Sequence, residues 1–86
     1  MVNPSEDWAE IAPLIEILPP IEQVDVLVRL LWKWDRQGVK TTDHPRDFFL
    51  WLVQWGKENA SILGSPEMRR RIDETHKELL QEHPNG

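Results

Sequence analysis

The chain has 86 residues, a formal net charge of −5 and no cysteine. This length predicts one small domain, and the absence of cysteine excludes disulfides and thiolate metal sites. The acidic balance argues against nucleic acid as a partner, because neutralisation of phosphates by basic residues supplies most of that affinity. The longest apolar run, residues 48–53, is far shorter than a membrane span of about 20 residues, and the first residues lack the pattern of a signal peptide. We therefore expect a cytoplasmic protein without membrane association.

The first predicted helix covers residues 5–18, with Ser5 as its N-cap. One apolar stripe runs along it: Trp8, Ile11, Ile15 and Leu18. Pro13 lies inside the segment and removes one backbone donor. The pattern therefore predicts either a kinked helix or a helix that starts again at Pro13.

The next segment has two conflicting periodicities. Every even position from Val24 to Trp34 is apolar, which is typical of a half-buried strand. Apolar residues also recur at helical spacing in the same stretch. Pro20 suits the first position of a helix and Gly38 suits its C-terminal cap. We therefore predict a helix over 20–37, and the alternative is an α+β fold with a hairpin formed by 24–35 and 48–55.

On that helix, successive residues are about 100° apart. One narrow stripe is charged and is expected to face solvent: Glu22, Asp25, Arg29, Lys33 and Arg36. Asp25 precedes Arg29 by four residues, which favours an ion pair. Trp32 and Trp34 fall about 200° apart, so they must face different neighbours. A cap at Gly38 would bring Val39 back onto Trp34.

The third predicted helix covers residues 45–58, with Asp43 or His44 as its cap and Pro45 in its first turn. One face is apolar, and further residues widen it: Phe48, Trp51, Leu52 and Trp55, then Phe49, Val53 and Gly56. Leu50 lies among the polar residues and is expected to be exposed.

The fourth predicted helix covers residues 66–82, with Ser65 as its N-cap and a frayed tail over 83–86. Its apolar stripe is narrow: Met68, Ile72, Thr75 and Leu79. This pattern is typical of a surface helix that packs along one edge.

The fold class predicted from these segments is all-α, a small four-helix bundle in a single domain, residues 1–86. The two central helices are apolar over more than half of their circumference, which indicates a central position or an interface. The alternative is that the outer helices cover this surface and the monomer is complete. The chain has five tryptophans and no tyrosine, and Trp dominates binding hot spots. We therefore expect a non-enzymatic, tryptophan-rich interaction module, either a homodimer or a subunit bound to another protein. The expected partner-binding residues are Trp32, Trp51, Trp55, Phe48 and Leu50.

Residues suited to catalysis or metal binding are sparse. Asp73, His76 and His83 fall near one side of the fourth helix, but a zinc site needs three or four converging ligands. Thr41 and Thr42 precede Asp43 and His44, but this cluster is more typical of a helix start than of an activated nucleophile. The chain contains no glycine-rich phosphate loop. We expect no enzyme activity, no metal and no cofactor.

The basic run Arg69, Arg70 and Arg71 supports an alternative function, a nucleic-acid-associated regulator that reads a duplex with the start of the fourth helix. These arginines point about 100° apart on a helix, so they make no single patch. Arg69 can pair with Asp73 and Arg70 with Glu74. A charge-laced helix surface is therefore the favoured interpretation of the run.

Overall fold

The computed structural model describes residues 3–82. Its elements are four α-helices and one 3₁₀ turn: α1 (Pro4–Ile15), α2 (Pro20–Arg36), η1 (Thr41–Asp43), α3 (Arg46–Glu58) and α4 (Pro66–Glu82). The described residues form no strand, so the all-α prediction is confirmed and the hairpin alternative is wrong. Within the same residues, no helix combines the length and the apolar character needed to cross a membrane. The predicted frayed tail lies outside the described residues.

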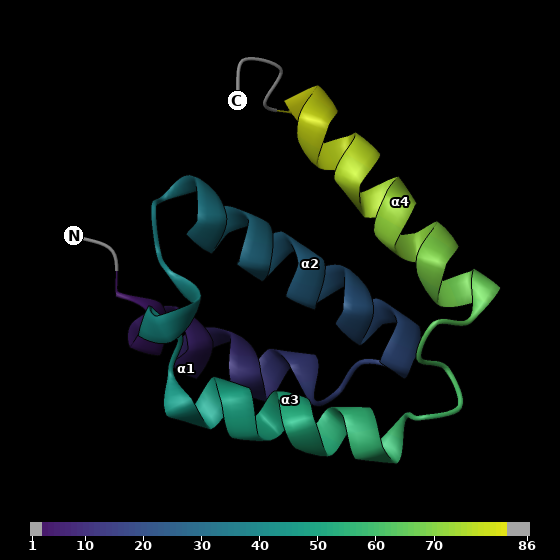
Figure 1. Ribbon diagram of the computed structural model, residues 1–86, viewed down its shortest axis with the longest axis horizontal. Coiled ribbons are helices and arrows are strands. Elements are labelled where there is room, and N and C mark those ends of the chain that lie inside the picture. The colour runs from purple at the N-terminus through teal and green to yellow at the C-terminus, as the bar shows by residue number, and fades with distance from the viewer. Residues whose placement is uncertain (1–2, 83–86) are drawn as a thin grey trace.

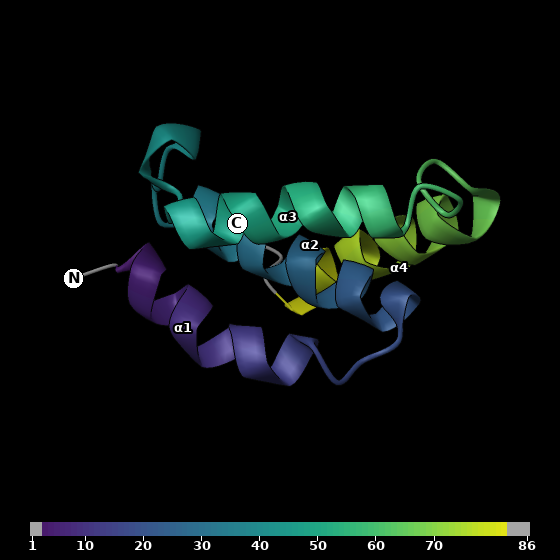
Figure 2. The same ribbon diagram turned by 90° about the horizontal axis from the view of Figure 1, so that it is seen from below.

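The helices alternate in direction, and α2 holds the others together. Figure 1 shows α1 and α3 running one way and α2 and α4 running the other way. In this view α2 lies between α4 on one side and α1 with α3 on the other. Figure 2 shows that α1 and α3 lie on opposite sides of α2.

Helix α1 begins one residue earlier than the sequence predicted. The side chain of Asn3 accepts hydrogen bonds from the amides of Ser5 and Glu6, at 3.1 and 3.3 Å. The predicted cap at Ser5 is therefore wrong, because Pro4 takes the first helical position, for which its fixed φ suits it. The helix passes through Pro13 without restarting and ends at Ile15, not at residue 18.

The C-terminal cap of α2 forms as predicted. Gly38 has a φ of 78°, a conformation that residues with a Cβ rarely adopt. The amide of Val39 donates to the carbonyl of Trp34 at 2.9 Å, and the amide of Gly38 donates to Asp35 at 3.1 Å. These two bonds satisfy carbonyl groups that the end of the helix leaves free. They also bring Val39 onto the core beside Trp34.

The predicted cap of α3 is wrong, whereas that of α4 is confirmed. Pro45 precedes α3 and no side chain caps it, because Asp43 belongs to η1. The ring of His44 instead packs on Trp34, with centroids 4.8 Å apart. At α4, the amide of Met68 donates to the hydroxyl of Ser65 at 3.2 Å.

The core lies where α1, α2 and α3 meet, and aromatic rings fill it. Trp34 is 0% exposed and Phe48 is 2% exposed. Their rings meet edge to face with centroids 5.2 Å apart, and Trp8 from α1 contacts Phe48 at 5.1 Å. The indole N–H of Trp34 donates to Asp7 at 3.0 Å, which ties α1 to α2. Trp34 and Trp32 face different neighbours, as predicted, since Trp32 is half-buried under the guanidinium of Arg36.

Helix α4 packs on the side of α2 that was expected to face solvent. Arg71 donates to Glu22 at 2.9 Å, Thr75 donates to Asp25, and Arg29 pairs with Glu78. The predicted pair of Asp25 with Arg29 also forms, at 3.1 Å. The expectation of a fully solvated stripe is therefore wrong, because α4 supplies matching polar groups beside its apolar stripe. That stripe faces inward as predicted, since Thr75 and Leu79 are buried.

Candidate functional site

An apolar groove opens on one flank of α3, where it faces α2 and α4. Its volume is about 290 Å³. Its lining is free of ionisable side chains among the described residues: Val24, Leu27, Val28, Leu31, Leu52, Trp55, Gly56, Leu63, Met68 and Ile72. The first four residues belong to α2, the next three to α3 and the last two to α4. Leu31 and Leu63 remain exposed at the mouth of this apolar groove. They leave apolar surface in contact with water.

A second hollow continues the apolar groove towards the start of α3. It has a volume of about 620 Å³ and shares Leu31 and Leu52 with the groove. Its other lining residues are Thr41, His44, Arg46, Phe48 and Phe49. The Phe49 side chain is 60% exposed. Val53, one turn further along the same flank, is also exposed.

Gly56 keeps the apolar groove open at its centre. A Cβ placed on Gly56 would have no atom within 4 Å outside its own helix and neighbours. Glycine inside a helix costs conformational entropy relative to alanine. Here the missing side chain leaves an empty space on the same flank as the exposed ring of Phe49, about two helical turns further along α3.

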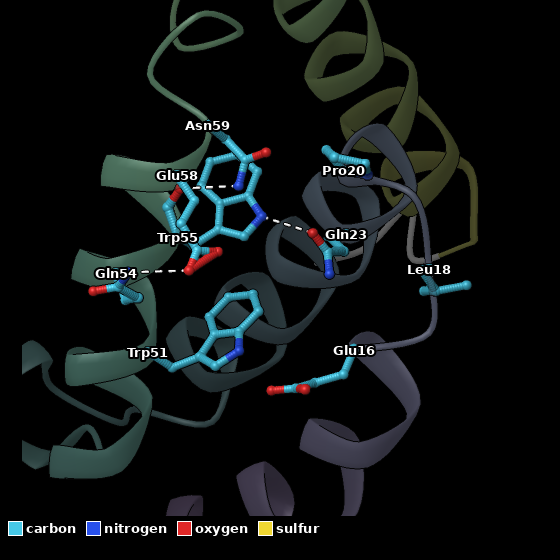
Figure 3. A pocket seen from close by; sticks show the side chains of 9 residues that line it. All are labelled: Glu16, Leu18, Pro20, Gln23, Trp51, Gln54, Trp55, Glu58 and Asn59. Atoms are coloured by element: carbon cyan, nitrogen blue, oxygen red, sulfur yellow. Dashed lines mark hydrogen bonds between the residues drawn. The ribbon is translucent and has the colours of Figure 1, made fainter.

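The opposite flank of α3 borders a different cavity, which we call the tryptophan pocket. Its volume is about 400 Å³. Figure 3 shows its nine lining side chains: Glu16, Leu18, Pro20, Gln23, Trp51, Gln54, Trp55, Glu58 and Asn59. Glu16 and Leu18 lie between α1 and α2, Pro20 and Gln23 lie at the start of α2, and the other five residues lie in α3 and at its C-cap, Asn59. Trp55 borders both cavities, whereas the other eight residues line the tryptophan pocket but not the apolar groove.

Hydrogen bonds join the three helices around the tryptophan pocket. The amide of Gln23 donates to the carbonyl of Ile15 at 2.9 Å and accepts from the indole of Trp55 at 2.7 Å. The side chain of Asn59 donates to the carbonyl of Trp55 at 2.9 Å. Gln54 donates to Glu58 at 3.0 Å. These hydrogen bonds join partly buried side chains of the three helices, so the frame of the pocket forms without a ligand.

Helix α4 forms one wall of the apolar groove, and Asp25 of α2 helps to hold α4 in place through its contacts with Thr75 and Arg71. Burial by itself raises the pKa of the Asp25 carboxyl group. Hydrogen bonds from Thr75 and Arg29, with the positive charges of Arg29 and Arg71, outweigh that effect. The pKa of Asp25 therefore lies below its ordinary value of 3.8. Burial lowers the pKa of Arg29, but hydrogen bonds and negative charge from Asp25 and Glu78 outweigh it, so the pKa of Arg29 is raised.

The five residues predicted to bind a partner do not share one surface. Phe48 and Trp55 are buried, with 2% and 6% of their surface exposed. Trp51 is half-buried in the tryptophan pocket, and Trp32 is half-buried between α2 and α4. Leu50 is 52% exposed, as predicted, but it belongs to neither cavity.

The arginines of α4 also separate. Arg71 turns towards Glu22 and Asp25 of α2, whereas Arg69 and Arg70 are exposed. Among residues 3–82, no three ionisable side chains are grouped so that they could hold a metal ion. His83, from the predicted cluster with Asp73 and His76, lies outside the described residues.

Several residues of the cavities escaped the sequence reasoning. Phe49 and Gly56, together with Val53 on the same flank, were placed only at the margin of the apolar face. The helical periodicity could have singled out this flank, since all three α3 residues follow one another at helical spacing. No periodic signal marked Gln23, whose role depends on the meeting of three helices.

The chain gives no match to known protein-family models, curated proteins or solved structures.

Proposed function

We propose that the chain is a non-enzymatic interaction module that forms a homodimer through the apolar groove. The observation that carries this proposal is the groove itself, whose lining has no ionisable side chain and whose mouth exposes Leu31 and Leu63. Contiguous apolar surface that water must cover is typical of interaction sites. Covering it with a second copy would remove that surface from water.

The flank of α3 is self-complementary, which favours a second copy as the occupant. Phe49 projects from it and Gly56 leaves a space in it. A twofold axis beside Leu52 and Val53, which lie midway between them, would pair α3 with an antiparallel copy. Phe49 of each copy would then enter the space at Gly56 of the other. Such reciprocal contacts are the rule in twofold dimers, and a buried aromatic ring is a typical anchor.

Charge also permits this dimer. Each copy carries a net charge of −5, so two copies repel one another at long range. Within the described part of the chain, no Asp or Glu lines the apolar groove or the adjoining hollow, and Arg46 is the charged lining residue of the hollow. Two acidic chains can therefore meet at this face without burying carboxylates against each other, which would be costly.

The test is the absolute mass in solution, measured by light scattering after size exclusion over a wide dilution series. We expect a dimer that dissociates on dilution. Phe49→Ala removes the projecting ring and Gly56→Phe fills the space, so each change alone should weaken association at least about tenfold. In the double variant, the ring added at position 56 of one copy can enter the space left at position 49 of the other copy. The double variant should therefore associate more tightly than either single variant.

A matched control lies on the same helix outside the apolar groove. Leu50→Ala also removes an exposed apolar side chain from α3 and should leave the dissociation constant unchanged. A chain that is monomeric at every concentration would overturn the proposal. So would a double variant that associates no better than the weaker single variant.

A further inference from the structure

The tryptophan pocket has the dimensions and the chemistry of a binding site for a small ligand. Its volume of about 400 Å³ is within the range of ligand pockets. It lies on the flank of α3 opposite to Phe49 and Val53, so the inference drawn from it does not depend on dimerisation.

The frame of the pocket is already in place without a ligand. Gln23 connects the carbonyl end of α1 to the indole of Trp55, with contacts of 2.9 and 2.7 Å. The ring of Trp51 packs against the ring of Trp8, with centroids 5.3 Å apart and an angle of 61° between the ring planes. A ligand would therefore spend little of its binding free energy on ordering the side chains that receive it.

The charge of the pocket is entirely negative. Glu16 and Glu58 are its ionisable lining residues, and no Lys, Arg or His among residues 3–82 lines it. Glu16 follows the last turn of α1, where the helix dipole is negative and no basic side chain compensates it. Figure 3 shows the carboxylate of Glu16 extending towards Trp51. An anion is disfavoured in this setting, and a cation is favoured.

The aromatic and apolar side chains of the pocket indicate which class of cation it would bind. Trp51 is half-buried and its indole ring lies within the pocket between Glu16 and Trp55 (Figure 3). Indole is the side chain that attracts cations most strongly through its face. Leu18 and Pro20 add apolar surface that suits carbon-bound hydrogens. A hydrated inorganic ion would make no favourable contact with these apolar side chains. An alkylammonium group can interact with the carboxylates through its charge and with the aromatic and apolar side chains through its carbon-bound hydrogens.

We propose that the tryptophan pocket binds an organic cation of the alkylammonium class, with its charged group between Glu16 and Trp51. The cation is neutralised by the carboxylate on one side and attracted by the indole face on the other. Its alkyl part contacts Leu18 and Pro20. The ligand is either a free small molecule or the alkylated side chain of a lysine, since both present the same group.

The test is a titration of the full chain with small probes, followed by the NMR signals of the tryptophan indole N–H groups. Choline carries the cationic group, and 3,3-dimethylbutan-1-ol is its neutral counterpart of equal shape. We expect choline to shift the Trp51 signal and to bind at least about tenfold more tightly than the neutral alcohol. Equal affinity for the two probes would overturn the proposal.

Two further probes distinguish the sources of the ligand. N-acetyl-trimethyllysine amide presents the quaternary group on a lysine side chain, and ethanolamine presents a primary ammonium group. Tighter binding of the lysine derivative than of choline would assign the pocket to a modified protein side chain. Tighter binding of choline or ethanolamine would assign it to a free cation, and either result supports the alkylammonium class.

Variants locate the binding within the pocket. Trp51→Leu should weaken choline binding about tenfold, and Trp51→Phe, which keeps an aromatic face, should weaken it less. Glu16 is exposed, so Glu16→Gln should leave the fold intact and weaken choline binding about threefold. Glu10→Gln removes the same charge from the exposed part of α1 outside the pocket and is the matched control. Equal effects of Glu16→Gln and Glu10→Gln would contradict the proposed site.

Discussion

The two flanks of α3 differ in how they meet their neighbours. On the flank that faces α4, apolar side chains surround the groove and none of its lining residues carries a charge. On the other flank, Gln23, Asn59 and Gln54 form hydrogen bonds around the tryptophan pocket. One helix thus presents an apolar surface whose free energy falls when it is covered, and a cavity framed by side chains that hydrogen-bond to one another. The first favours a macromolecular partner and the second favours a small ligand.

Trp55 is the side chain that the two flanks share, so its removal should have the largest effect. Trp55→Ala deletes a ring that is 6% exposed, and we expect it to lower the free energy of unfolding by about 3–5 kcal/mol. Urea unfolding followed by circular dichroism measures this loss.

Trp55→Phe separates the two contributions of the Trp55 side chain. It keeps apolar contact with the groove but removes the N–H that donates to Gln23 at 2.7 Å. We expect a smaller loss, about 1–3 kcal/mol, because the amide oxygen of Gln23 then lacks its donor. A loss of less than about 0.5 kcal/mol for Trp55→Ala would show that Trp55 is not a wall of either cavity.

The sequence was sufficient to predict the helices, because the signals for them are local. Pro20, Gly38 and Ser65 act within one turn of their own positions, and the structure places them as predicted. The predicted N-cap of α1 was wrong because the effect of Pro4 was not taken into account. Its fixed φ moved the first helical position back by one residue and made Asn3 the cap.

The sequence was insufficient to predict which helix covers which face. Helical periodicity placed Glu22, Asp25 and Arg29 on one polar stripe, and polar stripes usually face water. Their partners, Arg71, Thr75 and Glu78, are about fifty positions away in the chain. Periodicity carries no information about such distant pairing. For the same reason the aromatic residues could not be divided into core and cavity until α1, α2 and α3 had been placed.

Asp25 distinguishes the flanks because α4 borders the groove but not the tryptophan pocket. We expect Asp25→Asn to lower the free energy of unfolding by about 1–2 kcal/mol at pH 7, since charged hydrogen bonds to Arg29 are lost. The same variant should weaken dimerisation more than it weakens choline binding. Asp35→Asn, at an exposed acid of the same helix, is the control and should change stability by less than about 0.5 kcal/mol.

The difference in the free energy of unfolding between the wild type and Asp25→Asn should depend on pH, and the direction of that dependence follows from the pKa of Asp25. The folded-state pKa of Asp25 lies below 3.8, so its contribution is fully present well above that value. It is lost as the pH falls through the folded-state pKa, where the carboxylate of the folded protein takes up a proton. Unfolding curves of the wild type and of Asp25→Asn should therefore differ by the same amount at pH 7 and 5 and approach one another as the pH falls below 3.8. A difference that stays constant down to the lowest pH at which the wild type remains folded would contradict the role given to Asp25.

Gly56 allows a test in which stability and association move in opposite directions. Gly56→Ala adds a methyl group where no atom lies within 4 Å. We expect the free energy of unfolding to rise by about 0.5–1 kcal/mol, because alanine loses less conformational entropy in a helix. The dimer should weaken, because the methyl group occupies part of the space proposed for Phe49. A variant that is both more stable and more tightly associated would exclude Gly56 from the interface.

The smallest effect is expected at Leu50, which was predicted to bind a partner and lies on neither flank. Its side chain is 52% exposed, so Leu50→Lys should change the free energy of unfolding by less than about 0.5 kcal/mol. Because Leu50 lines neither the apolar groove nor the tryptophan pocket, the dimer dissociation constant and the affinity for choline should both stay unchanged. Light scattering and the indole NMR titration test these two expectations on one protein sample. Loss of dimerisation in Leu50→Lys alone, with Phe49→Ala unaffected, would move the interface from the groove to the outer face of α3, where Leu50 lies.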